Sequence, residues 1–333
     1  MTEIDYREHD QQTWEEDLND FVPARIFDAH NHLYYPEAVP EEFKKDHPKR
    51  QVTTDLDRLE TFHRRIYPGR EVHSLFLGEP WFGTNVNTYT ARQVADVKKD
   101  PLSRMSRLVT PRCTPEEIER DVKDHGFIGL KPYLRFSSTG DIHQCRIRDF
   151  LPEQQLEVAD DLGLWISMHL ARTDGCADEV NLKDLEHYTK RYPKAKWILC
   201  HCGRSFTYWP LRKAIDRLKA MPSIWYDLSA VNEMSVFVTL FKKEKIERIF
   251  FGSDLVPPNF RGKIVALGRA WACLMTDGIE QLQFPHCDGR PILSVYEQLL
   301  AMKMAAEAVD LSSDDVEDIF WRNAAREFNL QWA

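Results

Sequence analysis

Two histidines separated by one residue are the first groups in this sequence that could bind a metal. His30 and His32 close an apolar run that begins at Arg25. Side chains two residues apart on a β-strand point to the same face, so both imidazoles would lie together. Two neutral imidazoles at a strand end can supply half of a metal site. A pair of surface or turn histidines would fit the same residues, so the metal interpretation needs support from elsewhere in the chain.

Three further polar residues provide that support. His169, His201 and Asp254 each stand at or near the end of a later apolar run. Taken singly, each fits a satisfied strand-end side chain or a helix cap. Together with the first pair they offer a zinc-type set of three histidines and an aspartate, with one histidine left to carry protons. The pattern therefore predicts a metal site.

Eight short apolar runs would position these residues: 25–33, 71–78, 107–111, 127–132, 164–170, 197–203, 224–229 and 248–254. Such runs are too short for core helices and rich in β-formers, so we expect strands. Amphipathic stretches between them predict helices after the cap Thr114 and over 146–162, 179–192, 206–220 and 232–243. Repeated strand–helix alternation favours the α/β class and a closed (β/α)8 TIM barrel. A doubly wound sheet is the alternative, although no Gly-rich phosphate turn follows any run.

Some segments fall outside this alternation. Residues 1–24 show no sustained periodicity, and we expect an N-terminal arm that covers the bottom of the barrel or reaches a partner subunit. Residues 25–333 would form one domain that C-terminal helices close. The proline-containing segment 34–52 is a candidate lid over the active face. The interruption at 279–292 suggests no function.

Composition narrows the class of protein. A net charge of -9 argues against nucleic acid as a partner. The sequence shows neither an apolar run long enough to span a bilayer nor a signal-like segment, so no membrane partner is expected. Seven cysteines without a CxxC spacing indicate reduced thiols and a cytoplasmic location. A homo-oligomer is possible on these data.

The motifs resemble the amidohydrolase superfamily, and within it the amidohydrolase-2 branch that contains aminocarboxymuconate semialdehyde decarboxylase. The matching pieces are residues 27–32, 129–132, 168–169, 200–203, 252–254 and 323–325, which cover the chain from about 25 to 330. The resemblance implies a distorted (β/α)8 barrel with one divalent ion. The ligands it implies are His30, His32, His169 and Asp254.

The resemblance also suggests roles for two neighbours of the ion. His201 would sit beside the metal and handle a proton, whereas other branches use the same histidine as a ligand. Lys131 matches a strand-four lysine that some binuclear members carboxylate. Pro132 follows it here, so one metal remains the favoured count. If His201 points into the barrel, strand alternation would turn Cys200 and Cys202 toward the helices.

Cationic residues after the predicted strands suggest the substrate. Guanidinium and ammonium groups at this face suit a carboxylate-bearing molecule. The candidates for substrate binding are Lys131, Arg135, Arg172 and Arg204. The alternative is that the arginines pair with acidic residues of the rim, among them Glu79, Asp174 and Asp178.

These residues outline a mechanism. A bound Zn²⁺, or alternatively Mn²⁺, would activate water, with Asp254 accepting its proton and His201 serving the oxyanion or leaving group. The leading hypothesis is a metal-dependent hydrolase of an amide, ester or lactone in a small anionic substrate. A metal-dependent non-oxidative decarboxylase of an aromatic or enoic acid is the alternative, and a catalytically silent binding barrel is the third.

Overall fold

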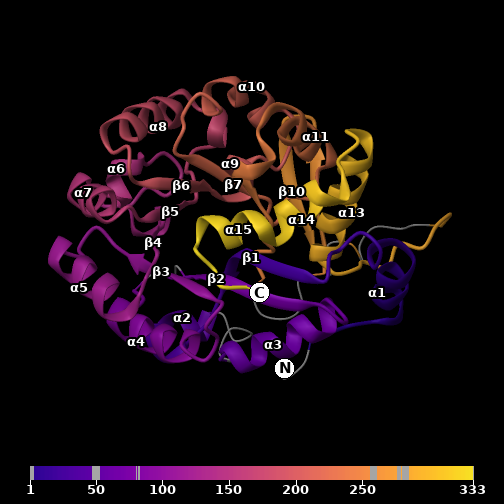
Figure 1. Cartoon of the computed structure of the whole chain (residues 1–333), viewed down its shortest axis with the longest axis horizontal. Coiled ribbons are helices and arrows are strands. Elements are labelled where there is room, and N and C mark those ends of the chain that lie inside the picture. Colours follow the sequence, from indigo (N-terminus) through magenta and orange to yellow (C-terminus); the bar gives the residue numbers. More distant parts are fainter. Residues whose placement is uncertain are drawn as a thin grey trace.

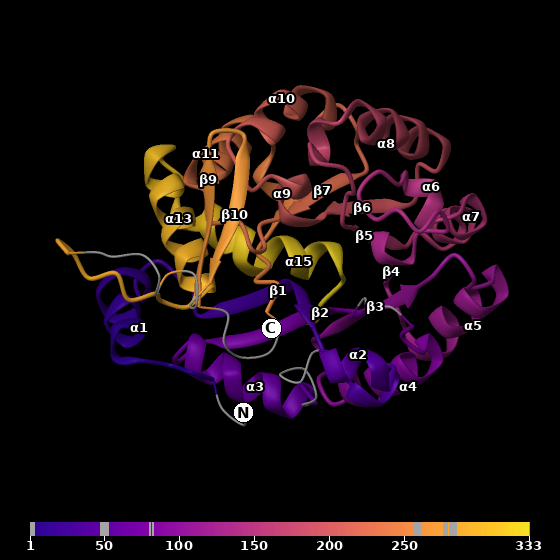
Figure 2. The same cartoon turned by 180° about the vertical axis from the view of Figure 1, so that it is seen from behind.

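A ring of eight parallel strands forms the centre of the computed structural model, which describes residues 4–46, 53–79, 81, 83–255, 261–275, 279 and 285–332. The strands pair in sequence order from β1 to β8 and helices surround them (Figures 1 and 2). Their bounds are β1 Arg25–His32, β2 Glu71–Leu77, β3 Arg104–Val109, β4 Gly129–Pro132, β5 Trp165–Met168, β6 Lys196–Leu199, β7 Ile224–Asp227 and β8 Ile249–Phe250.

The segment after β8 returns to β1 and brings the sheet close to closure. Ala29 N donates to Phe251 O at 2.9 Å, and Asp254 N donates to His30 O at 2.8 Å. The predicted (β/α)8 TIM barrel is therefore confirmed. These bonds also hold Asp254 next to the first strand, although more than 200 residues separate the two in sequence.

The α-helices lie mainly outside the ring (Figure 1). They are α1 Glu8–Thr13, α2 Glu41–Asp46, α3 Leu56–Ile66, α4 Val86–Val97, α5 Pro115–His125, α6 Ile147–Phe150, α7 Glu153–Leu162, α8 Glu179–Arg191, α9 Cys200–Arg204, α10 Trp209–Leu218, α11 Met234–Lys243, α13 Ser294–Ala308, α14 Ser313–Glu317 and α15 Asn323–Glu327. Short 3-10 or π turns are η1 Trp14–Leu18, η2 Pro36–Ala38, η4 Leu134–Phe136, η5 Gly175–Ala177, η6 Ile246–Arg248 and η7 Asp318–Arg322.

Local sequence signals explain several helix boundaries. α5 begins with the expected capping box, in which Thr114 Oγ1 accepts from Glu117 N and Glu117 Oε2 accepts from Thr114 N. It ends at Gly126, whose φ of 76° is the left-handed conformation that glycine adopts readily. The helix expected over 146–162 is instead two helices, because the chain leaves helical geometry at Leu151 and restarts after Pro152.

An aromatic cluster fills the bottom of the barrel, at the amino ends of the strands. Phe328 packs against Phe27, Trp165 and Phe250 with ring centroids 5.1–5.5 Å apart. The residues that cover this end therefore follow α15. In the N-terminal segment, Trp14 packs beside α13 against Tyr296. That this segment covers the bottom of the barrel or reaches a partner subunit stays a prediction.

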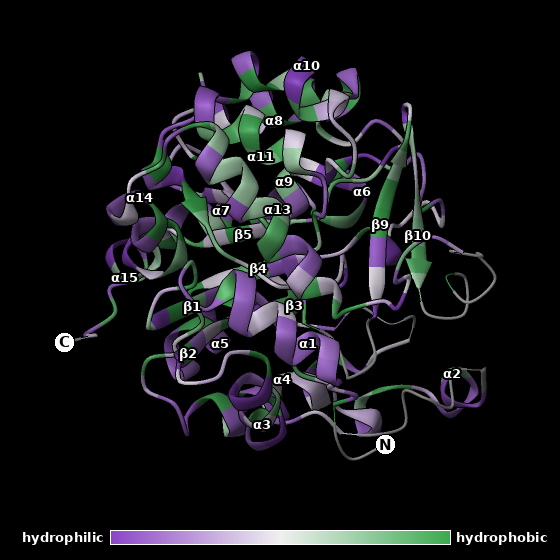
Figure 3. Cartoon of the chain, turned by 90° about the vertical axis from the view of Figure 1, so that its right-hand side faces the viewer, coloured by the Kyte–Doolittle hydropathy of each residue, from purple (hydrophilic) through white to green (hydrophobic). Residues whose placement is uncertain are grey.

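A hairpin that the sequence did not predict follows the eighth strand. β9 (Gly262–Leu267) and β10 (Ala270–Met275) pair antiparallel and stand beside the barrel (Figure 3). Arg261, at the base of the hairpin, forms a buried ion pair with Asp10 of α1. The described part of the N-terminal segment is thereby tied to the hairpin. In the described residues, no helix combines the length and apolar character needed to cross a bilayer.

Candidate metal centre

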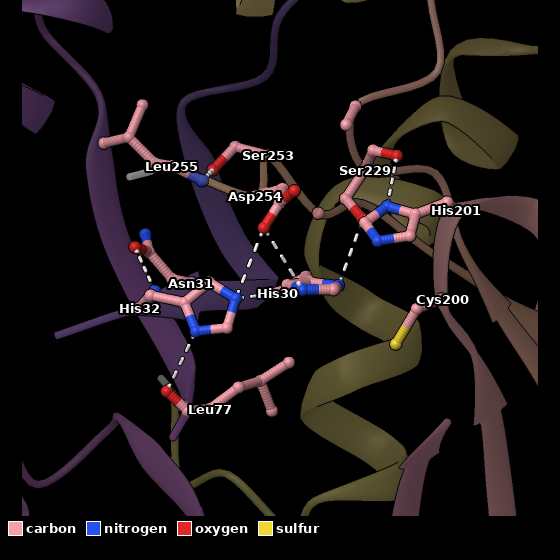
Figure 4. Close-up of polar contacts among 12 residues, drawn as sticks. His30, Asn31, His32, Leu77, Cys200, His201, Ser229, Ser253, Asp254 and Leu255 are labelled. Carbon is pink, nitrogen blue, oxygen red and sulfur yellow. Dashed lines mark hydrogen bonds and ion pairs between the residues drawn. The ribbon is translucent and has the colours of Figure 1, made fainter. Parts of the chain in front are cut away.

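Three acceptor atoms converge where β1 meets the segment after β8. His30 Nε2 lies 3.2 Å from His32 Nε2 and 3.4 Å from Asp254 Oδ1, and His32 Nε2 lies 3.3 Å from the same oxygen (Figure 4). Both imidazoles are almost fully buried, whereas 27% of the Asp254 side chain remains exposed. The cluster therefore opens on the side of Asp254.

The hydrogen bonds of the two rings fix which nitrogen carries the proton. His30 Nδ1 lies 2.9 Å from Asp227 Oδ2, and His32 Nδ1 lies 3.1 Å from the carbonyl oxygen of Leu77. A carbonyl or carboxylate oxygen can only accept, so each Nδ1 is the protonated nitrogen. Both Nε2 atoms therefore present lone pairs toward each other and toward a carboxylate oxygen.

A bound cation would remove the repulsion between these three converging lone pairs. Donor atoms held about 2.0–2.2 Å from a zinc ion lie roughly 3.3–3.6 Å apart in a tetrahedron. The three separations observed here, 3.2–3.4 Å, match a bound divalent ion closely. Imidazole rings whose Nδ1–H donates to a carboxylate or carbonyl are also the usual form of metal-binding histidine. The residues present thus fit the metal that the sequence predicted.

His201 lies beside this cluster and has the same tautomer. Its ring centroid is 4.9 Å from that of His30, and its Nδ1 lies 3.0 Å from the carbonyl oxygen of Ser229. Since that oxygen only accepts, Nδ1 carries the proton and Nε2 is free to take one. Such a ring can receive a proton from a neighbouring group, which is the role that the sequence analysis expected for His201.

Asp227 and Ser229 link His30 to His201. Asp227 Oδ2 accepts from His30 Nδ1, while Oδ1 accepts from His201 N at 2.9 Å and from Ser229 Oγ at 2.5 Å. Ser229 Oγ in turn accepts from His201 Nδ1 at 2.9 Å. His30, His201 and Asp227 lie close enough together to suggest a second ion. The protons of the hydrogen bonds already lie between these atoms and leave no space for an ion. We therefore interpret Asp227 as a hydrogen-bond partner of the predicted ligands.

The backbone around His201 differs from the predicted strand. β6 ends at Leu199, and His201, Cys202 and Gly203 have φ values of 57°, 51° and 70°. Strand alternation does not apply to this left-handed segment. Cys200 does not turn toward the helices as expected, because its Sγ lies 3.5 Å from the buried Nζ of Lys131. In the described chain, the clusters with metal-ligand spacing contain no cysteine.

His169 lies further from the cluster than predicted for a ligand. Its ring centroid is 5.0 Å from that of His201, and it belongs to neither group of mutually close ligand atoms among the described residues. Its Nδ1 lies 3.2 Å from Leu170 O, which again leaves Nε2 unprotonated. His169 thus has the tautomer of a ligand at the margin of the site, and its coordination of the ion stays a prediction.

Burial keeps the imidazoles of His30 and His169 neutral. It lowers the pKa of His30 to about 4 and that of His169 well below its ordinary value. Although burial alone would raise it, the pKa of Asp254 is held below its usual range whenever the adjacent His30 or His32 carries a proton on Nε2. Neutral imidazoles and an ionised carboxylate are the protonation states that bind a divalent cation.

The four cations predicted to bind substrate have different environments. Arg172 Nε donates to Asp178 Oδ1 at 2.8 Å, which favours the ion-pair alternative for this residue. Lys131 is fully buried, with Nζ 5.2 Å from the centre of the Tyr133 ring. Arg135 lies 5.3 Å above the Trp81 ring. Arg204 has no carboxylate partner among the described residues, and its buried Nε makes no hydrogen bond there.

Sequence reasoning missed three residues that hold the predicted ligands in place. Asp227 and Ser229 end the seventh run, and their position at a strand end was an available signal. Asp28 is fully buried and accepts from Ser253 N at 2.9 Å and from His30 N at 3.1 Å. It therefore ties β1 to the segment that carries Asp254.

Comparison with known families agrees with this geometry. A family model described as Amidohydrolase matches residues 27–330. The chain belongs to the amidohydrolase family. The match includes every strand of the barrel after the first two residues of β1, and every predicted ligand. A comparison with curated proteins found no match.

Solved structures similar to this chain share its fold at low identity. Amidohydrolase 2 from Bifidobacterium longum subsp. infantis has a TM-score of 0.54 and 13% identity, covering 93% of this chain and 100% of its own. A dihydroxybenzoic acid decarboxylase from Polaromonas sp. JS666, with bound manganese and the inhibitor 2-nitroresorcinol, has a TM-score of 0.55 and 14% identity, with 94% and 98% covered. The 5-carboxyvanillate decarboxylase from Sphingomonas paucimobilis has a TM-score of 0.52 and 12% identity, with 93% and 100% covered.

Proposed function

We propose that this chain is a metal-dependent hydrolase that cleaves an amide, ester or lactone bond in a small carboxylate-bearing substrate. The observation that carries the proposal is the convergence of three lone pairs from His30, His32 and Asp254 within 3.4 Å. His169 would complete the ligand set. Zn²⁺ fits the nitrogen-rich donors best, and Mn²⁺ is the alternative.

Each protein group then has a defined task. A bound divalent ion supplies Lewis acidity and lowers the pKa of water toward neutrality. Asp254, the exposed member of the cluster, accepts the proton of the attacking water at its carboxylate. His201 receives or returns a proton at Nε2, because Nδ1 is held as a donor to Ser229. Arg204 offers the unpaired N–H of Nε to the substrate carboxylate, while its Nη1 donates to Arg172 O.

A non-oxidative decarboxylase is the second candidate. Two similar structures are a dihydroxybenzoic acid decarboxylase with bound manganese and a 5-carboxyvanillate decarboxylase. The same groups could serve this reaction, with His201 delivering a proton to carbon as carbon dioxide leaves. Measuring carbon dioxide release and acid production on one panel of carboxylic acids separates the two reactions.

Metal content and turnover of three single variants test the proposal. We expect His169→Ala to lower the bound metal, His201→Ala to keep the metal while abolishing turnover, and the control His187→Ala, on the exposed face of α8, to change neither. Equal metal loss in the first two would make His201 a ligand. A purified chain that binds no divalent ion and gains no activity from Zn²⁺ or Mn²⁺ would leave only the binding-barrel hypothesis.

A further inference from the structure

A groove lies at the same end of the barrel as the metal centre. It encloses about 440 Å³ and is lined by residues from three parts of the chain. They follow β5, follow β6 up to the start of α10, and belong to the turn of the β9–β10 hairpin and the first residues of β10. The hairpin, absent from the sequence prediction, thus supplies one wall of a cavity beside the site.

Phe206 separates the groove from the metal centre. Its ring centroid lies 5.6 Å from that of His201 on one side and 4.7 Å from that of Trp271 on the other. A molecule in the groove would therefore lie one side chain away from the proposed proton carrier. This distance suits a remote part of a substrate whose reacting bond lies at the metal.

The groove holds polar groups that the described protein does not satisfy. The hydroxyl of Thr207 makes no hydrogen bond there, although the residue is only 1% exposed. Arg204 Nε is likewise buried without a described partner. Buried polar atoms without partners are costly, so a ligand that accepts hydrogen bonds would stabilise both.

Charge and aromatic surface define the ligand further. The guanidinium of Arg269 stacks 5.0 Å from the centre of the Trp209 ring and has no carboxylate partner among the described residues. Asp174 is the one acidic residue in the lining, against two arginines. Trp209 and Trp271 add flat apolar faces. A positive, aromatic and donor-rich groove selects a planar anion.

We propose that this groove binds a carboxylate-bearing aromatic group of the substrate, with Arg204, Thr207 and Arg269 as hydrogen-bond donors and Trp209 and Trp271 as stacking surfaces. The inference rests on the proposed function, since it assigns the part of the substrate that the metal centre does not hold. It predicts that preferred substrates carry an aromatic acid remote from the bond that reacts.

Titration of the metal-loaded protein with benzene-1,3-dicarboxylate, followed by tryptophan fluorescence and calorimetry, tests this assignment. We expect saturable binding that Arg269→Ala weakens about tenfold, as expected for loss of a charge-assisted hydrogen bond. Thr207→Val should weaken binding in the same direction with little change in packing volume. Arg212→Ala removes an exposed arginine of α10 outside the groove and should bind like the unaltered chain.

Binding by His32→Ala separates the groove from the metal centre. We expect this variant to bind the probe within about twofold of the unaltered chain, because the groove does not use the ion. Loss of binding in His32→Ala together with full binding by Arg269→Ala would place the probe on the metal. That result, or the absence of saturable binding, overturns the groove assignment and leaves the proposed metal chemistry standing.

Discussion

Asparagine at position 227 should weaken metal binding although Asp227 is not a predicted ligand. The carboxylate accepts from His30 Nδ1 at 2.9 Å, His201 N at 2.9 Å, Ser229 N at 3.2 Å and Ser229 Oγ at 2.5 Å. An amide has only one oxygen. If that oxygen keeps the three donors of Oδ1, the NH₂ group faces His30 Nδ1, where two donors now meet.

The conflict between the two donors is relieved if His30 changes tautomer, but this change weakens the binding of the ion. The proton then moves to Nε2, the atom that lies 3.2 Å from His32 Nε2 and 3.4 Å from Asp254 Oδ1. Loss of an outer partner of a ligating histidine typically lowers metal affinity about 10- to 100-fold. We therefore expect the Kd for Zn²⁺ to rise by about that factor, or ~1.4–2.7 kcal/mol.

Competition against a chromophoric chelator at fixed pH measures the change, and thermal unfolding of the metal-free proteins measures stability separately. Asp121→Asn is the matched control, because Asp121 accepts from the buried Arg107 Nε at 2.7 Å on the outer side of the barrel. It should lower the unfolding temperature and leave the Kd unchanged. A folded Asp227→Asn protein with unaltered Kd, or equal weakening in the control, would refute the reasoning.

Two further predictions concern a close contact and a surface charge. A Cβ on Gly252 would lie 2.9 Å from the Cβ of His30, so Gly252→Ala should displace that ligand and raise the metal Kd; full affinity would show that β1 can shift freely. Burial opposes the charge of His73, but hydrogen bonds to Asp100 and Glu71 raise the pKa of this residue. The stability that protonated His73 contributes to the fold is therefore complete below the unfolded pKa of about 6.5 and is lost as pH rises through the folded pKa. The stability advantage over His73→Gln, measured by denaturant unfolding, should therefore shrink from about pH 5.5 to pH 8.5, and growth over that range would reverse the assignment.

Regular strand geometry explains why the convergence of His30 and His32 could be predicted. His30 and His32 lie within β1, where the two-residue period is a direct property of the extended backbone. Asp254 could be placed for a related reason, because parallel barrel strands bring their carboxyl ends to one face. These inferences required only the order of the strands.

The directions of side chains beyond the strand ends could not all be predicted in this way. Four consecutive residues with positive φ, His201 to Arg204, follow Leu199 closely, and no hydrophobic period encodes them. Cys200, which directly precedes them, faces Lys131, opposite to the prediction. The β9–β10 hairpin was missed because long-range contacts, such as that of Arg261 with Asp10, hold it against the barrel.

Non-glycine residues with a strained, left-handed backbone are concentrated around the proposed site. Six of the eight non-glycine residues with positive φ in the described chain follow strands β5 to β8, among them Arg172, His201, Ala230 and Asp254. Each such residue costs roughly 1–2 kcal/mol in a left-handed conformation. Selection for heat resistance alone should therefore favour glycine at this rim, for example at Ala230. The backbone flexibility that glycine adds would make the neighbouring proposed catalytic groups more mobile. At these positions, a higher unfolding temperature should therefore be accompanied by a lower turnover rate.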